Sequence, residues 1–198
     1  MSTASRSLKT MKVKFKEVSN DKIKDSFLEV LHKYPDLHDF SITLFQKRVK
    51  ASTMQAQPII TFKDLFKRVK KYRIKLGVYV SSSESLKVED VPKKVLIGWF
   101  AHELGHLVDY LSYSTVGMIK YGLRYITSKS FKMKAEHEAD YIAIKNGFRE
   151  EIIATKEWVL NHDLVGQKYK DVLNKYYLSI EQVELCNIDD APFQPIVK

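Results

Sequence analysis

The residues His102-Glu103-Leu104-Gly105-His106 constrain this chain more than any other feature, because they make sense together only on a helix. Residues four apart lie on one face of an α-helix, so two imidazoles at this spacing can bind one metal ion. A glutamate between them can act on a water molecule that the metal binds. The five residues therefore predict a helix with two metal ligands and a general base.

The sequence around this motif favours a long helix. Asp90 is a candidate N-cap and Pro92 suits a first helical turn, and apolar residues then recur at helical spacing as far as Tyr110. Gly98 and Gly105 each cost about 1 kcal/mol relative to alanine inside a helix. We therefore expect a largely buried helix whose backbone is approached closely by another element.

A catalytic metal site needs a third protein ligand and one position left for water. The later segment Glu136-His137-Glu138-Ala139-Asp140 offers two carboxylates, because Glu136 and Asp140 are four residues apart and share a helical face. One carboxylate can bind the metal while the other accepts the ring N–H of a ligand histidine. We expect this helix to end near Gly147.

Several other residues near these segments have to be weighed as ligands. His137 and His162 both remain possible from the sequence alone. Asp109 shares a face with the motif histidines but lies about 10 Å of helical rise from His102, too far for a shared metal. Glu138 is expected to form a surface ion pair with Lys134, one turn earlier.

Attack of a metal-bound water on a carbonyl group also requires a donor for the oxyanion that develops. Four residues downstream of the motif can serve, and the sequence does not rank them: Tyr121, Arg124, Tyr125 and His162.

HExxH followed by ExxxD on a later helix resembles the gluzincin metallopeptidases. That group includes thermolysin, the membrane-embedded prenyl-protein endopeptidases and small soluble single-domain relatives, and HELGH and EHEAD are closest in wording to the last two. The resemblance covers residues from about 70 to 147 and implies zinc-dependent hydrolysis of a peptide or protein substrate. It assigns zinc to His102, His106 and Glu136, the general base to Glu103, and the support of a ligand imidazole to Asp140.

Two alternatives belong to other functional classes. DNA-associated proteases of the SprT type also combine HExxH with a basic surface, but they use a third histidine, for which only His137 or His162 is available. The second alternative is a metallopeptidase-like domain that binds or regulates a partner without cleaving it. Glu103 counts against the second alternative, because a structural zinc site has no use for a base.

Periodicity gives a coarse fold. Alternating residues predict strands over 11–18, 40–49 and 72–80, and helical spacing predicts a helix over 21–33 and helices from 148 to about 186, with a capping box at Ser179 and Gln182. We expect one α+β metallopeptidase-like domain over 1–198, zincin-like by resemblance, with a small mixed or antiparallel N-terminal sheet, a long metal-binding helix and a helical C-terminal half. We expect an irregular tail over 187–198, and the 72–80 strand is our candidate for pairing with an extended substrate.

Charge is unevenly distributed. The chain carries a net charge of +9, and residues 1–100 contain 21 Lys and Arg against 10 Asp and Glu. Seven of these cations fall within a short span that also contains Phe62, Phe66 and Tyr72: Lys63, Lys67, Arg68, Lys70, Lys71, Arg73 and Lys75. A contact with nucleic acid or another anionic surface is conceivable, but a solvated face is the favoured interpretation.

The single cysteine, Cys186, excludes a disulfide within the chain, and the N-terminal residues lack an apolar stretch of secretory type. The most apolar window, Val95 to Leu111, is shorter than a membrane span requires. We therefore expect a cytoplasmic protein. Small soluble gluzincins can be held latent by a terminal segment, and residues 186–198 are a candidate for that role.

Overall fold

The four strands form one mixed sheet in the computed structural model, which describes residues 11–49, 52–62 and 68–187. The strands β1 (Lys12–Lys16), β2 (Ser41–Gln46), β3 (Met54–Pro58) and β4 (Lys71–Leu76) lie in the order β1-β2-β4-β3. β1, β2 and β4 run parallel, whereas β3 is antiparallel to β4 and forms an edge of the sheet.

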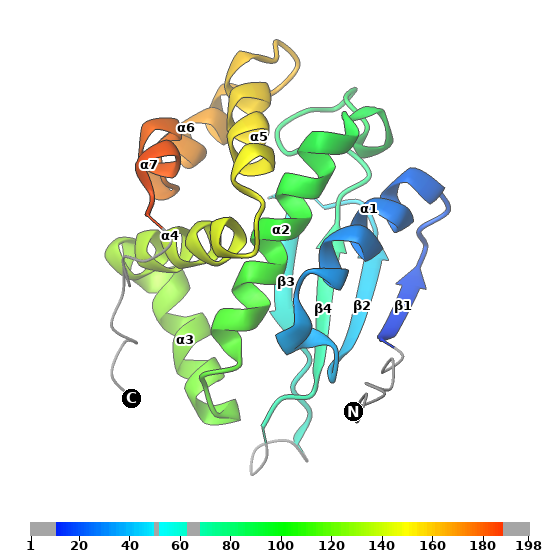
Figure 1. Ribbon diagram of the computed structural model, residues 1–198, viewed down its shortest axis with the longest axis vertical. Coiled ribbons are helices and arrows are strands. Elements are labelled where there is room, and N and C mark those ends of the chain that lie inside the picture. The colour runs from blue at the N-terminus through cyan, green and yellow to red at the C-terminus, as the bar shows by residue number, and fades with distance from the viewer. Residues whose placement is uncertain (1–10, 50–51, 63–67, 188–198) are drawn as a thin grey trace, which may run out of the picture.

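Helices make up most of the remainder, so the α+β composition expected from periodicity is confirmed (Figure 1). They are α1 (Asp21–His32), α2 (Lys93–Tyr110), α3 (Thr115–Thr127), α4 (Lys129–Lys145), α5 (Arg149–Asn161), α6 (Gln167–Tyr176) and α7 (Ile180–Leu185). Two short 3-10 turns precede β2 and α2, at Pro35–Leu37 and Val88–Asp90. The capping box predicted at Ser179 and Gln182 begins α7.

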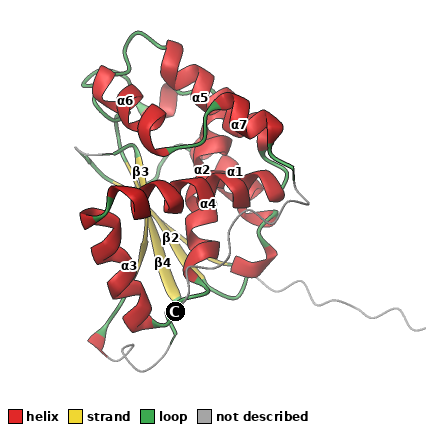
Figure 2. Ribbon diagram, turned by 90° about the vertical axis from the view of Figure 1, so that its left-hand side faces the viewer, coloured by secondary structure: helices red, strands yellow, loops and turns green. Residues whose placement is uncertain are grey.

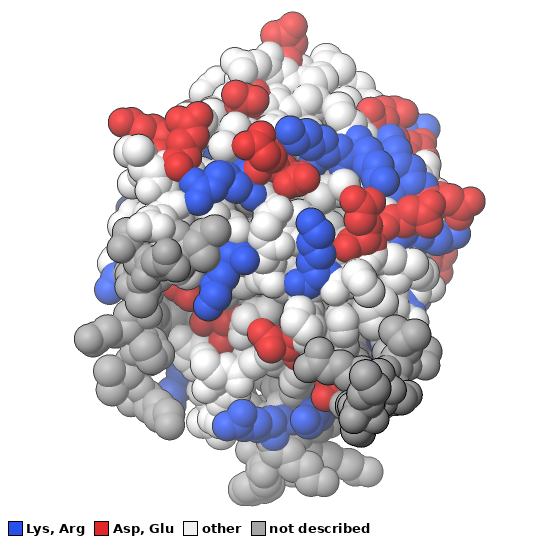
Figure 3. Space-filling model, viewed as in Figure 1, with Lys and Arg blue, Asp and Glu red and all other residues white. Residues whose placement is uncertain are grey.

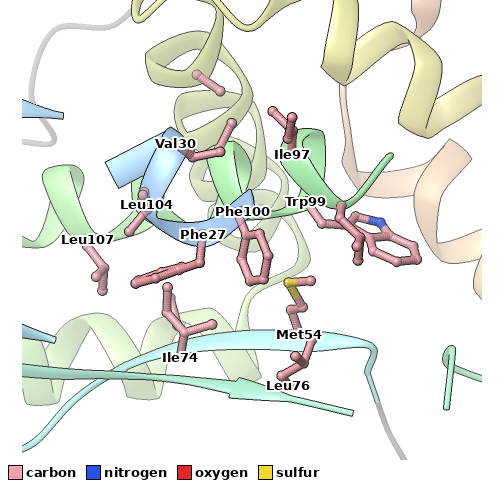
Figure 4. Close-up of a cluster of buried hydrophobic side chains, with 14 of the residues drawn as sticks. Phe27, Val30, Met54, Ile74, Leu76, Ile97, Trp99, Phe100, Leu104 and Leu107 are labelled. Atoms are coloured by element: carbon pink, nitrogen blue, oxygen red, sulfur yellow. The ribbon is translucent and has the colours of Figure 1, made fainter. Parts of the chain in front are cut away.

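The core lies between the sheet and the two helices that cover one of its faces, α1 and α2 (Figure 1). Alternate residues of β2 and β4 point into it, as period-two patterning requires. Phe27 from α1 packs edge-on against Phe100 from α2, with ring centroids 5.3 Å apart. Ile74 and Leu76 of β4 close the cluster from the sheet side (Figure 4).

Several predicted boundaries were wrong. The strand expected over 72–80 ends at Leu76. Asp90 does not cap the long helix: it ends a 3-10 turn, and α2 begins at Lys93 behind Pro92, with no side-chain cap. Val91 between them is extended, the conformation that a following proline favours, so the chain cannot enter the helix at Asp90.

Two helices cross α2 at its glycines, as the sequence led us to expect. At Gly98 a Cβ atom would collide with Glu151 and Thr155 of α5. At Gly105 it would lie 2.5 Å from the Ala139 carbonyl oxygen of α4. Figure 2 shows α4 running across α2, with α3 and α6 on either side of it. These crossings bring α4 against the motif.

No helix within the described ranges is long and apolar enough to cross a membrane. The predicted tail falls almost wholly on residues 188–198, outside the described residues.

Candidate metal centre

Side chains from α2 and α4 meet at a buried cluster of three possible metal ligands. His102 and His106 come from α2 and Glu136 comes from α4, and each offers a donor atom within 4.8 Å of the others. Glu136 Oε2 lies 3.1 Å from His102 Nε2 and 3.4 Å from His106 Nε2. Nitrogen and oxygen ligands arranged tetrahedrally around one zinc ion are about 3.3 Å apart. The three residues predicted as ligands therefore stand at the spacing that a metal ion needs.

Asp140 orients one of the two imidazoles. Its Oδ1 lies 2.8 Å from His102 Nδ1, and its Oδ2 accepts hydrogen bonds from Lys156 Nζ at 2.8 Å and from the Leu178 backbone N–H at 3.3 Å. A proton on Nδ1 satisfies Asp140 and leaves Nε2, the nitrogen that faces Glu136, free to bind a cation. The sequence anticipated this role for Asp140 but not the involvement of Lys156 from α5.

Opposite charges in the cluster stabilise one another and shift the pKa values of its members. Burial lowers the pKa of His102, but hydrogen bonds and charges from Asp140 and Glu136 outweigh it and raise that pKa to about 10. Burial raises the pKa of Glu136, yet His102 and His106 hold it well below its usual range. Burial also opposes ionisation of Asp140, whose pKa falls to about 2 because of Lys156 and His102. Two carboxylates thus face His102, and a cation bound there would take the place of its proton.

Glu103 lies on the sheet side of α2, where it meets the edge strand. Its Oε2 accepts a hydrogen bond of 2.5 Å from the backbone N–H of Ala56 in β3. Burial raises the pKa of Glu103 above its ordinary value, although the two motif histidines and the Ala56 N–H oppose that rise. A carboxylate with a raised pKa, beside the possible metal ligands, is suited to taking and returning a proton near neutral pH.

The strand expected to pair with an extended substrate, β4, cannot accept an added strand. β4 is paired on both sides, with β2 and with β3, and therefore has no free edge. β3, which the sequence analysis missed, is the edge strand beside the candidate site. Every residue of β3 stands opposite a β4 residue, but the Ala56 N–H donates its hydrogen bond to Glu103 instead of to β4. The alternation in Met54–Pro58 was obscured by Ala56 and Pro58, which rarely mark strands.

Aromatic residues enclose the cluster. The Tyr125 hydroxyl donates a hydrogen bond to Glu136 Oε1, which places this oxyanion candidate directly at a possible metal ligand. Tyr177 lies against His102, with ring centroids 5.1 Å apart, and Tyr110 stacks on His106 at 6.1 Å. Tyr110 continues the helical spacing of the motif, so its place beside His106 follows from the sequence. No nearby residue predicts the contact of Tyr177 with His102, because that contact depends on the path of the chain after α6.

The other candidates lie elsewhere. Neither His137 nor His162 belongs to the ligand cluster of the described residues. The His162 ring packs on Trp158, with centroids 4.7 Å apart, and its Nδ1 accepts a hydrogen bond from the Leu164 N–H. Asp109 is also outside the cluster, as expected.

Three further residues singled out in the sequence pack among other side chains. Tyr121 lies in an aromatic cluster with Tyr110, at 5.2 Å between ring centroids, and Arg124 sits over the Phe131 ring at 4.4 Å. Glu138 is half-buried rather than on the surface, and its pKa rises to about 7 because of burial and the nearby charge of Asp109. The predicted surface ion pair is therefore not how Glu138 is accommodated.

Comparison of the chain with known protein families, with curated proteins and with solved structures finds no match.

Proposed function

We propose that this protein is a zinc-dependent metallopeptidase with a zincin-like fold, of the gluzincin type that its motifs resemble. The observation that carries the proposal is the convergence of His102, His106 and Glu136 on one point, with Glu103 beside them. A purely structural metal site would have no need of that fourth residue.

Zinc fits the donor set well. Two imidazole nitrogens and one carboxylate oxygen are the ligands that zinc commonly takes in hydrolytic enzymes, which leave one position open. The contact from Asp140 to His102 is the supporting hydrogen bond that ligand histidines usually make. When bound, zinc would polarise the substrate carbonyl and lower the pKa of a bound water to about 7.

Glu103 supplies the proton transfers. Its carboxylate accepts a proton from the attacking water and then delivers it to the nitrogen of the leaving amine. Burial raises the pKa of Glu103 above its ordinary value, which makes its carboxylate a stronger base than an exposed one. Tyr125 is the candidate donor to the developing oxyanion, and its single hydroxyl proton would turn from Glu136 to the substrate for that role.

The edge strand β3 suits an extended peptide. Its outward-facing backbone groups lie beside Glu103 and can pair with a substrate in the manner of an added strand. We therefore propose β3, and not the strand predicted over 72–80, as the strand that pairs with an extended substrate.

The alternatives have less support. An SprT-type site requires a third histidine, and the cluster of the described residues is completed by Glu136 instead. A non-catalytic binding domain would retain the ligands but would not need Glu103 between the motif histidines.

Metal content tests the site directly. Protein purified without chelator should contain about one zinc per chain, and Glu136→Gln should lose most of it. His137→Ala should retain zinc, because His137 lies outside the cluster. Absence of zinc from the wild type, or its loss in His137→Ala rather than in Glu136→Gln, would refute this ligand set.

Activity is tested with a mixture of fluorogenic peptides and with an unfolded protein substrate. Glu103→Gln should retain zinc and lose about 10²–10⁴-fold in rate, because it removes the base alone. Zinc-loaded wild-type protein that cleaves none of these substrates would favour the non-catalytic alternative.

A further inference from the structure

The sheet face opposite α1 and α2 carries two parallel rows of cations. Alternation along β1 and β4 places every second residue on this face, and register aligns the rows across β2. We call these six residues the basic sheet face: Lys12, Lys14 and Lys16 of β1, and Lys71, Arg73 and Lys75 of β4. All six are exposed or half-buried, whereas their neighbours Tyr72, Ile74 and Leu76 are buried in the core.

No acidic residue interrupts the rows. The four strands contain no Asp or Glu at any position. On the opposite side of the molecule, positive and negative side chains are interspersed (Figure 3). Within the strands the basic sheet face therefore carries cations alone, which attract a polyanion. Beyond the strand ends, Glu17 and Glu89 line a hollow together with Phe45, Lys47 and Lys87.

The spacing of the cations suits a chain of phosphates. Successive cations in one row are about 6.6 Å apart, and the two rows, separated by β2, are about 10 Å apart. The row between them is formed by Ser41, Thr43 and Phe45. Ser41 and Thr43 are small and bear hydroxyls, so a chain of phosphates could lie along β2 with cations on both sides.

Phe45 adds an aromatic surface within this charged face. It is half-buried, and Lys16 Nζ lies 4.6 Å and Arg73 Cζ 5.9 Å from its ring centroid. Cations along a backbone and an aromatic ring on which a base can stack are what sheets that bind single-stranded nucleic acid combine. Phe45 lies in register between Lys16 and Lys75, so a stacked base would be flanked by cations.

We propose that the basic sheet face binds single-stranded nucleic acid, with phosphates along the two cation rows and a base stacked on Phe45. The face is on the other side of the sheet from the core and α2, and the proposal does not depend on the peptidase activity. A membrane surface fits less well, because the face offers no aliphatic side chains to insert into lipid. A duplex fits less well, because its bases are not free to stack on Phe45.

The first test is fluorescence anisotropy of the full chain with a labelled oligothymidine of about 20 nucleotides. A face variant combines Lys14→Gln, Arg73→Gln and Lys75→Gln. A control variant removes the same charge from exposed residues of α3, α4 and α6, as Lys120→Gln, Lys145→Gln and Lys168→Gln. Three lost phosphate contacts should weaken binding about 100-fold at about 0.1 M salt and lower the salt slope by about 2.

The control variant should retain most of the affinity. Equal losses in the two variants would show an effect of net charge alone and would overturn the proposal, as would wild-type protein that does not bind the oligonucleotide. Circular dichroism and zinc content should be unchanged in both variants, because every substituted residue lies outside the core and the ligand cluster.

Phe45→Ala tests the mode of binding. Loss of base stacking should weaken binding of the single strand by about 5-fold or more without changing the salt slope. A duplex of the same length should bind more weakly than the single strand and be insensitive to Phe45→Ala. A duplex that binds as tightly as the single strand would overturn single-strand binding. Binding to phosphatidylserine vesicles in place of the oligonucleotide, lost in the face variant, would assign the face to membranes instead.

Discussion

Lys156 Nζ lies 2.8 Å from Asp140 Oδ2, and both side chains are almost fully buried. The ammonium group comes from α5 and the carboxylate from α4, and the same carboxylate contacts His102 on α2. Three helices are thus joined at one buried charge pair next to the candidate metal ligands. The contact ties the packing of α5 to the orientation of a ligand imidazole.

Removal of that ammonium group should destabilise the fold. Lys156→Met leaves Asp140 buried with one charged partner fewer and should cost about 3–5 kcal/mol of unfolding free energy, measured by urea denaturation. Lys93→Met is a matched control, since Lys93 pairs with Glu29 at 2.8 Å on the surface, and it should change little. Similar losses in the two variants would contradict the importance of the buried pair.

Asp140 should set the affinity for metal. Asp140→Asn keeps the size of the side chain but weakens its hold on the His102 N–H, so zinc affinity should fall about 10–100-fold. Competition with a chromophoric chelator measures the change. An unaltered affinity would mean that Asp140 serves the fold through Lys156 and Leu178 rather than the metal.

The Ala56 N–H should tune the base. Ala56→Pro removes this donor, and proline is tolerated because the N–H points out of the edge strand and not into the ladder. The N–H lowers the pKa of Glu103, so its loss should raise that pKa further. The acidic limb of the rate profile should then move to higher pH. Ala56→Gly keeps the N–H, so the acidic limb of its rate profile should not move. An acidic limb that does not move in Ala56→Pro would exclude an effect of the Ala56 N–H on the pKa of Glu103.

Glu138 should make stability depend on pH. Its pKa is about 7 in the folded chain and near the model-peptide value of 4.5 when unfolded. Between these values the folded state binds more protons, so the unfolding free energy falls as pH rises through this window. Glu138→Gln removes this cost and should melt at a higher temperature than wild type at about pH 8, but not at about pH 5. The melts are compared in excess chelator, and a variant that gains nothing at the higher pH would disprove the assignment.

Features that depend on a few neighbouring residues could be predicted from the sequence. The motif spacing placed His102 and His106 on one helix, and Gly98 and Gly105 correctly indicated close helix crossings, because these are properties of a few turns of chain. The boundary of α2 was missed at Asp90, where Pro92 and the extended Val91 outweigh the capping preference.

Features that arise from distant pairing could not be read in advance. The Ala56 hydrogen bond to Glu103 joins residues 47 positions apart, and the approach of Tyr177 to His102 depends on the path of α6. Only one row of the basic sheet face follows from local sequence, namely the alternating Lys12, Lys14 and Lys16. Their alignment with β4 required the parallel register through β2.

Gly105 sets the distance between the two halves of the candidate site. A Cβ atom there would lie 2.5 Å from the carbonyl oxygen of Ala139, which is three residues from Glu136. The fourth letter of His-Glu-Leu-Gly-His is therefore a spacer, and a methyl group added to it would push α4 outwards and carry the carboxylate away from both imidazoles. Gly105 takes no part in the proposed chemistry, yet only a residue without a side chain lets α4 lie close enough for the three candidate ligands to meet.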